Sequence, residues 1–123
     1  MTASPLAAAR RAVQDAGREV VSIETFAWLR GVSRIASQKL IEGHALRPVC
    51  AWDVRGSTPL YRLSDLATAL TGRARPIDPE RLAQARSASV IATVAGQPVA
   101  VLFRREPARA MGAWLHESPK RLW

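Results

Sequence analysis

The sequence predicts a small α+β protein in which short helices and β-hairpins alternate along the chain. Signals for helix starts recur, because a serine or an aspartate repeatedly precedes apolar residues at helical spacing, as at Ser4, Ser22 and Ser33. Between the helices lie pairs of short β-branched or aromatic runs separated by turns that contain glycine and proline. With 123 residues, 48% of them hydrophobic, the chain suits one compact domain with a modest core.

The first half is expected to contain three helices. An N-terminal helix begins with Ser4-Pro5 and ends at Gly17. After the extended residues Val20-Val21, a helix capped by Ser22 runs to Gly31. A further helix over 34–42 follows the Ser33 cap. The apolar stripe expected on this helix consists of Val32, Ala36 and Leu40.

A β-hairpin is expected next. Residues 49–54 and 60–63 are predicted to be its strands, joined by the turn Gly56-Ser57-Thr58-Pro59. Ser64 then caps a helix that ends at Gly72. We therefore place a first region at residues 1–72.

Residues 73–123 are predicted to form a second module of helix, hairpin and helix. Asp78-Pro79-Glu80 starts a helix that extends to Ala88. Strands over 89–94 and 99–103 form a hairpin through Ala95–Pro98, and Glu106-Pro107 starts a last helix to His116. The apolar segment 89–103 is a candidate for dimerisation.

The positive charge indicates a polyanionic partner. The net charge is +8 and the sequence pI is about 11.4, with the basic groups spread over both halves of the chain. Such a surface favours binding to phosphates through the release of counterions. The simpler alternative is a basic surface without a ligand. A membrane surface is less well supported, because no segment combines a long apolar face with a lysine-rich one.

Other classes of function find little support in the sequence. One cysteine, Cys50, allows no internal disulfide, and with two separated histidines, His44 and His116, it suggests no metal site. The longest apolar run, 89–103, is interrupted by Gly96-Gln97-Pro98, and no secretory signal is apparent, so a cytoplasmic protein is expected. No catalytic grouping or glycine-rich phosphate loop indicates an enzyme or a cofactor.

The segment 22–70 carries the most informative motifs. From Ala27 to Ser33 it reads A-W-L-R-G-V-S, and from Arg55 to Leu66 it reads R-G-S-T-P-L-Y-R-L-S-D-L. In the first motif a small residue lets two helices cross closely, Gly31 permits a tight turn, and Ser33 caps the second helix. In the second motif a glycine turn projects a hairpin from the helices.

These motifs resemble the winged helix-turn-helix of MerR-type transcription regulators, phage excisionases and phage small-terminase DNA-binding domains. The resemblance covers residues 22–70 and implies that the helix over 34–42 enters the major groove while the hairpin over 49–63 acts as a wing. Ser37 departs from the pattern, because related sequences usually bury an aliphatic residue there. Residues 73–123 match no such family, so effector sensing is not carried over.

The resemblance makes the polar residues of the second helix and the wing the candidate DNA contacts. Arginine pairs well with guanine and glutamine with adenine, whereas lysine more often meets phosphate. The expected contacts are Arg34, Ser37, Gln38, Lys39, Arg47, Arg55 and Arg62. For each of them, an ordinary solvated surface position is the alternative.

The sequence therefore predicts a sequence-specific double-stranded DNA-binding protein, a small transcriptional regulator that acts as a homodimer. One alternative is an architectural DNA-binding protein of a mobile element, like an excisionase or a small terminase. Another is an adaptor that uses the same fold to bind a protein partner.

Overall fold

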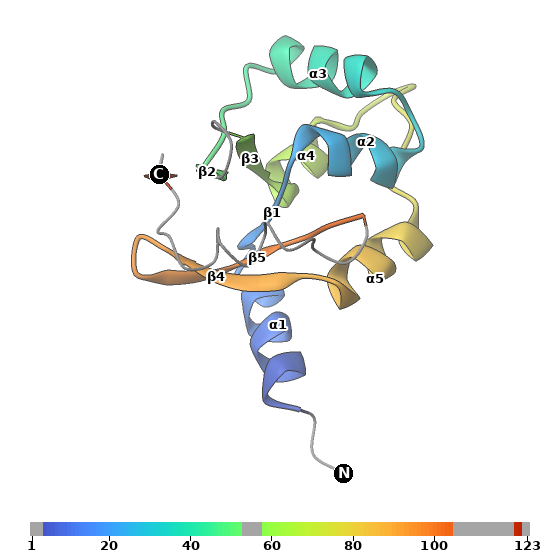
Figure 1. Ribbon diagram of the computed structural model, residues 1–123. Coiled ribbons are helices and arrows are strands. Elements are labelled where there is room, and N and C mark those ends of the chain that lie inside the picture. The colour runs from blue at the N-terminus through green and yellow to red at the C-terminus, as the bar shows by residue number, and fades with distance from the viewer. Residues whose placement is uncertain (1–3, 53–57, 105–119, 122–123) are drawn as a thin grey trace.

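The computed structural model describes residues 4–52, 58–104 and 120–121, and within these ranges the chain has an α+β fold (Figure 1). The helices are α1 (Pro5–Asp15), α2 (Ile23–Arg30), α3 (Arg34–Gly43), α4 (Leu63–Ala69) and α5 (Pro79–Ser87). The strands are β1 (Glu19–Val21), β2 (Cys50–Trp52), β3 (Thr58–Arg62), β4 (Val90–Val94), β5 (Gln97–Val101) and β6 (Lys120–Arg121). The predicted helix over 107–116 and the wing residue Arg55 lie outside the described residues.

Most helices begin where the sequence places a capping side chain. Ser4, Ser22, Ser33 and Asp78 each accept a hydrogen bond from a backbone N–H in the first turn of the following helix, at 3.0–3.2 Å. Ser64 is the exception. The helix α4 begins one residue before it, at Leu63, and has no side-chain cap, so the prediction that Ser64 caps this helix was wrong.

Strand β1 connects the two halves of the chain. The strand order is β4-β5-β1-β3-β2-β6. Val21 in β1 lies opposite Tyr61 in antiparallel pairing with β3, and Val20 lies opposite Val101 in parallel pairing with β5. The segment that the sequence suggested was only an extended approach to α2 is thus a central strand. Residues on either side of position 72 share one sheet.

The C-terminal hairpin is tighter than expected. Its turn is the dipeptide Ala95-Gly96, with φ angles of 58° and 74°, and both residues adopt the left-handed conformation that such turns require. Strand β5 therefore starts at Gln97, two residues earlier than the sequence indicated. The hairpin nevertheless forms from the segment that the β-branched residues predicted.

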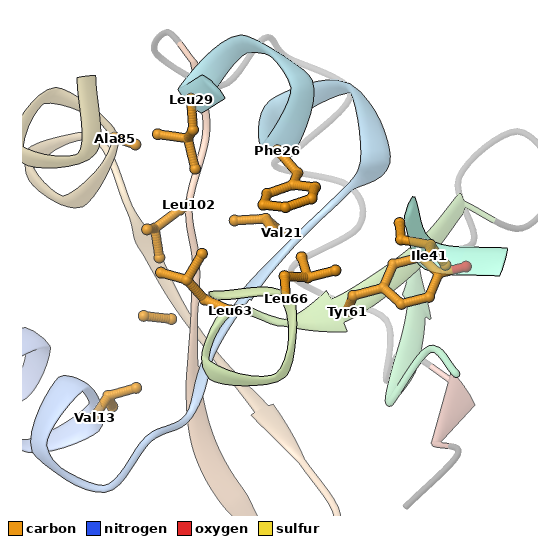
Figure 2. Close-up of a cluster of buried hydrophobic side chains, with 11 residues drawn as sticks. Val13, Val21, Phe26, Leu29, Ile41, Tyr61, Leu63, Leu66, Ala85 and Leu102 are labelled. Carbon is orange, nitrogen blue, oxygen red and sulfur yellow. The ribbon is translucent and has the colours of Figure 1, made fainter. Parts of the chain in front are cut away.

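Apolar side chains cover both faces of the central strands. Val20 and Val21 are both fully buried, although successive side chains of a strand point to opposite faces. Val21 belongs to a cluster that joins the helices to the sheet (Figure 2). Val20 belongs to a second cluster, with Cys50, Leu60 and Val99 among its members. This packing fixes α2 and α3 relative to the sheet, with α1 at the opposite end of the molecule (Figure 1).

Candidate nucleic-acid interface

The helices α2 and α3 are joined by a turn of three residues. Gly31 adopts a left-handed conformation with φ 67°, which glycine accommodates without steric cost. The N–H groups of Gly31 and Val32 donate to the carbonyl oxygens of Trp28 and Ala27, each at 3.1 Å. Ser33 then caps α3. These local bonds fix the start of α3 relative to the end of α2.

One face of α3 is exposed and mainly polar. Its side chains come from Arg34, Ile35, Gln38, Lys39 and Glu42, all of which are exposed. Their spacing places them on a single side of the helix. The opposite side packs on the core through Ile41, which is 3% exposed, and through the half-buried Leu40. The apolar stripe was therefore predicted wrongly at Ala36, which is exposed.

Ser37 is not part of this exposed face. Its side chain is fully buried and accepts a hydrogen bond from the guanidinium of Arg30 at 3.2 Å. The prediction that Ser37 contacts DNA was therefore wrong, because the side chain points toward α2 and the core. At this inward-facing position of α3 a serine thus meets a charged donor.

Arg30 connects three segments of the chain from a buried position. Its guanidinium donates to Ser37 of α3, donates to the carbonyl oxygen of Arg75 at 2.9 Å, and lies 5.3 Å from the centre of the Phe26 ring. Within the described ranges it forms no ion pair with a carboxylate. Burial lowers the pKa of Arg30. The buried charge of Arg30 is thus stabilised by a carbonyl oxygen, a hydroxyl oxygen and an aromatic ring, and not by a carboxylate.

Within the exposed face, Gln38 and Glu42 are connected. The Gln38 amide donates to the Glu42 carboxylate at 3.1 Å, one helical turn away. Arg34 and Lys39 lie on the same face and leave it with a net positive charge. Any partner that accepts a hydrogen bond from the Gln38 amide must compete with the Glu42 carboxylate. The negative charge of Glu42 also makes this part of the face better suited to hydrogen-bond donors than to a phosphate group.

Ile35 is a residue of this face that the sequence analysis missed. It is 66% exposed, more than any other large hydrophobic side chain among the described residues. Its spacing of three residues from Gln38 and four from Lys39 places it on their side of the helix and could have indicated its exposure. A solvated isoleucine between polar neighbours gives the face an apolar contact point.

The remaining candidate residues lie in different surroundings. Arg47 is exposed in the connection between α3 and β2. Arg62 is half-buried at the end of β3, so only part of its side chain faces solvent. The structure thus brings Arg34, Gln38 and Lys39 together on α3 and leaves Arg47 beyond the end of that helix.

No helix among the described residues is long and apolar enough to cross a membrane. The same part of the chain contains no group of three or more side chains that could hold a metal ion. Comparison of the chain with known protein families, with characterised proteins and with solved structures finds no match.

Proposed function

We propose that the protein binds double-stranded DNA in a sequence-specific manner, with α3 in the major groove. The observation that carries this proposal is the exposed face of α3. Arg34, Gln38 and Lys39 lie together on it, while the opposite side of the helix is fixed in the core. The major groove of B-DNA admits an α-helix, and it presents a distinct pattern of donors and acceptors for each base pair.

The side chains of this face match the groups in the groove. Arg34, at the N-terminal end of α3, can donate two hydrogen bonds to O6 and N7 of guanine, and Gln38 can pair with N6 and N7 of adenine. Ile35 offers an apolar contact for the methyl group of thymine. Lys39, farther along the helix, suits a phosphate.

The hairpin of β2 and β3 would act as a wing beside this helix, which makes the arrangement a winged helix-turn-helix. Arg47 lies between α3 and β2, at the point where the chain passes from the helix to the hairpin. Phosphate contacts by Arg47, Arg55 and Arg62 would position the protein without reading sequence.

As a biological role, we propose that the protein regulates transcription as a homodimer. A helix of ten residues reads few base pairs, so one protomer offers limited affinity and specificity. Two protomers related by a two-fold axis would bind two half-sites of a palindrome and overcome this limit.

Selection of bound duplexes from a random double-stranded library, at near-physiological salt and followed by sequencing, tests the proposal. We expect an enriched motif with two-fold symmetry, and Gln38→Ala should relax the preference at one base pair of each half-site. Phased repeats without symmetry would favour an architectural role. Failure to bind any duplex would overturn the proposal.

A further inference from the structure

A surface depression lies beside the turn between α2 and α3, and arginines from three separate parts of the chain line it. Arg34 comes from α3, Arg81 from α5, and Arg104 from the segment after β5. The other lining residues are Glu24, Ala27, Trp28, Gly31 and Val32. Its volume of about 500 Å³ is within the range of small-ligand sites.

Arg81 is held in place before any ligand arrives. Its guanidinium donates to the carbonyl oxygen of Trp28 and lies 5.3 Å from the centre of the Trp28 ring. Arg81 also lies 4.0 Å from the Asp78 carboxylate, but both side chains of this ion pair are exposed, so the pair contributes little to holding Arg81 in place. A side chain that is already ordered loses less conformational freedom when it binds a ligand.

Gly31 lies next to two guanidinium groups at the edge of the depression. A Cβ atom at this position would lie 3.6 Å from a terminal nitrogen of Arg81 and 3.9 Å from the guanidinium carbon of Arg75. The guanidinium groups of Arg75 and Arg81 therefore both lie close to the turn. Arg75 adds a further positive charge at the edge of the depression.

The depression has an excess of positive charge. Glu24 is its one acidic lining residue, against the three arginines. Arg34 and Arg104 are both exposed, and neither forms an ion pair with a carboxylate in the described ranges. Guanidinium groups in this number favour an anionic oxygen ligand, and their planar forks match the oxygens of phosphate.

We propose that this depression binds a phosphate group, and that the group belongs to the DNA backbone next to the bases that α3 reads. The assignment to DNA rests on the proposed function. It is supported by the position of Arg34, which lines the depression and also belongs to the exposed face of α3. When Arg34 pairs with a base, Arg81 and Arg104 remain to bind the phosphate. A duplex seated on α3 would pass the depression, so Arg81 and Arg104 would extend the interface beyond residues 22–70.

The test measures the salt dependence of DNA binding by the full chain and by Arg104→Gln. Arg104 is exposed, so the substitution should leave the fold intact. Arg11→Gln, on the exposed surface of α1 at the opposite end of the molecule, removes the same charge as a control (Figure 1). We expect Arg104→Gln to weaken binding about 3- to 10-fold on all DNA sequences. The salt slope, which is the slope of the logarithm of the binding constant against the logarithm of the salt concentration, should fall in magnitude by about 0.9, as the loss of one phosphate contact requires. Arg11→Gln should leave the slope unchanged.

A second arm distinguishes DNA from free phosphate. Inorganic phosphate is titrated while the NMR signals of the Gly31 and Val32 amides are followed in the wild type and in Arg104→Gln. If the wild type binds no DNA but phosphate gives saturable shifts that Arg104→Gln weakens, the phosphate site stands and the proposed function fails. If the wild type binds DNA and Arg104→Gln changes neither the salt slope nor the phosphate shifts, the site is refuted and the proposed function stands. If neither DNA nor phosphate binds, both fail.

Discussion

The buried guanidinium of Arg30 donates a hydrogen bond to the Ser37 hydroxyl at 3.2 Å and so joins α2 to α3. Both side chains are almost inaccessible to solvent, at 6% and 0% exposure. The polar contact sits where two packed helices usually meet through apolar side chains. Together with the buried Ile41 it lies on the inward-facing side of α3, and the remaining polar residues of the helix stay available on the outside.

Ser37→Ala is expected to destabilise the protein by about 1.5–3 kcal/mol. The substitution leaves a buried, charged donor without one of its acceptors, and hydrogen bonds to charged groups are worth more than neutral ones. The free energy of unfolding is measured by urea denaturation. Ser87→Ala is the control, because Ser87 is an exposed helical serine of α5, and its change should remain within about 0.5 kcal/mol. Equal stability of the two variants would show that the Arg30–Ser37 bond contributes nothing.

The ion pair between Glu19 and Arg86 should respond unequally to the loss of either partner. Both Glu19 carboxylate oxygens accept from Arg86 at 2.9 Å, and these bonds raise the pKa of Arg86. The Glu19 side chain is 9% exposed, whereas that of Arg86 is 35% exposed. Arg86→Met would therefore leave a carboxylate buried without a partner, while Glu19→Gln leaves an arginine that can reach water.

We accordingly expect Arg86→Met to cost about 2–4 kcal/mol and Glu19→Gln about 1–2 kcal/mol in the free energy of unfolding. Thermal or urea unfolding of both variants measures the difference. Arg11→Met, which removes an exposed arginine from α1, should change stability by less than about 0.5 kcal/mol. A larger loss for Glu19→Gln than for Arg86→Met would contradict the burial argument.

Cys50 should make the protein sensitive to alkaline pH. Burial raises the pKa of its thiol from 9.0 to about 11, because the thiolate is poorly solvated inside the fold. The pKa is higher in the folded than in the unfolded chain, so the stabilising contribution is complete below about pH 9 and is lost as the pH rises through about 11. The pKa of Tyr61 is also raised, by burial and by Glu42, and adds to the loss at higher pH.

Urea unfolding at about pH 8 and at about pH 10.5 isolates the contribution of the thiol. Wild-type protein should lose more stability between these values than Cys50→Ala, which retains Tyr61 but has no thiol to ionise. Parallel losses in the two proteins would mean that Cys50 does not ionise on unfolding in this range.

Local features of the fold could be predicted from the sequence, whereas long-range pairings could not. The caps at Ser22 and Ser33 and the glycine turn at Gly31 depend on neighbouring residues, and the structure confirms them. The role of β1 depends on pairing with Val101, far along the chain. Three residues of strand carry too little pattern to indicate a partner at such a distance.

Only part of the candidate site could be predicted, because here too the contacts that decide it join residues far apart in the sequence. Apolar spacing on α3 suggested that Ala36 faces inward, but the buried side of the helix is set by Ser37 and Ile41. A serine is an inward-facing residue here because of Arg30, a partner on another helix. No pattern within α3 alone indicates that partner, and the depression that includes Arg81 and Arg104 likewise forms from segments distant in sequence.

The most direct test of DNA recognition by α3 compares Arg34→Ala with Arg11→Ala on a selected duplex. Both substitutions remove one exposed arginine, the first from the proposed reading face and the second from the opposite end of the molecule (Figure 1). We predict that Arg34→Ala weakens binding by about tenfold or more and relaxes the preference for one guanine, as the loss of a bidentate base contact requires. Arg11→Ala should change the affinity by less than about twofold. Equal losses for the two variants, with the base preference retained in both, would contradict recognition by α3.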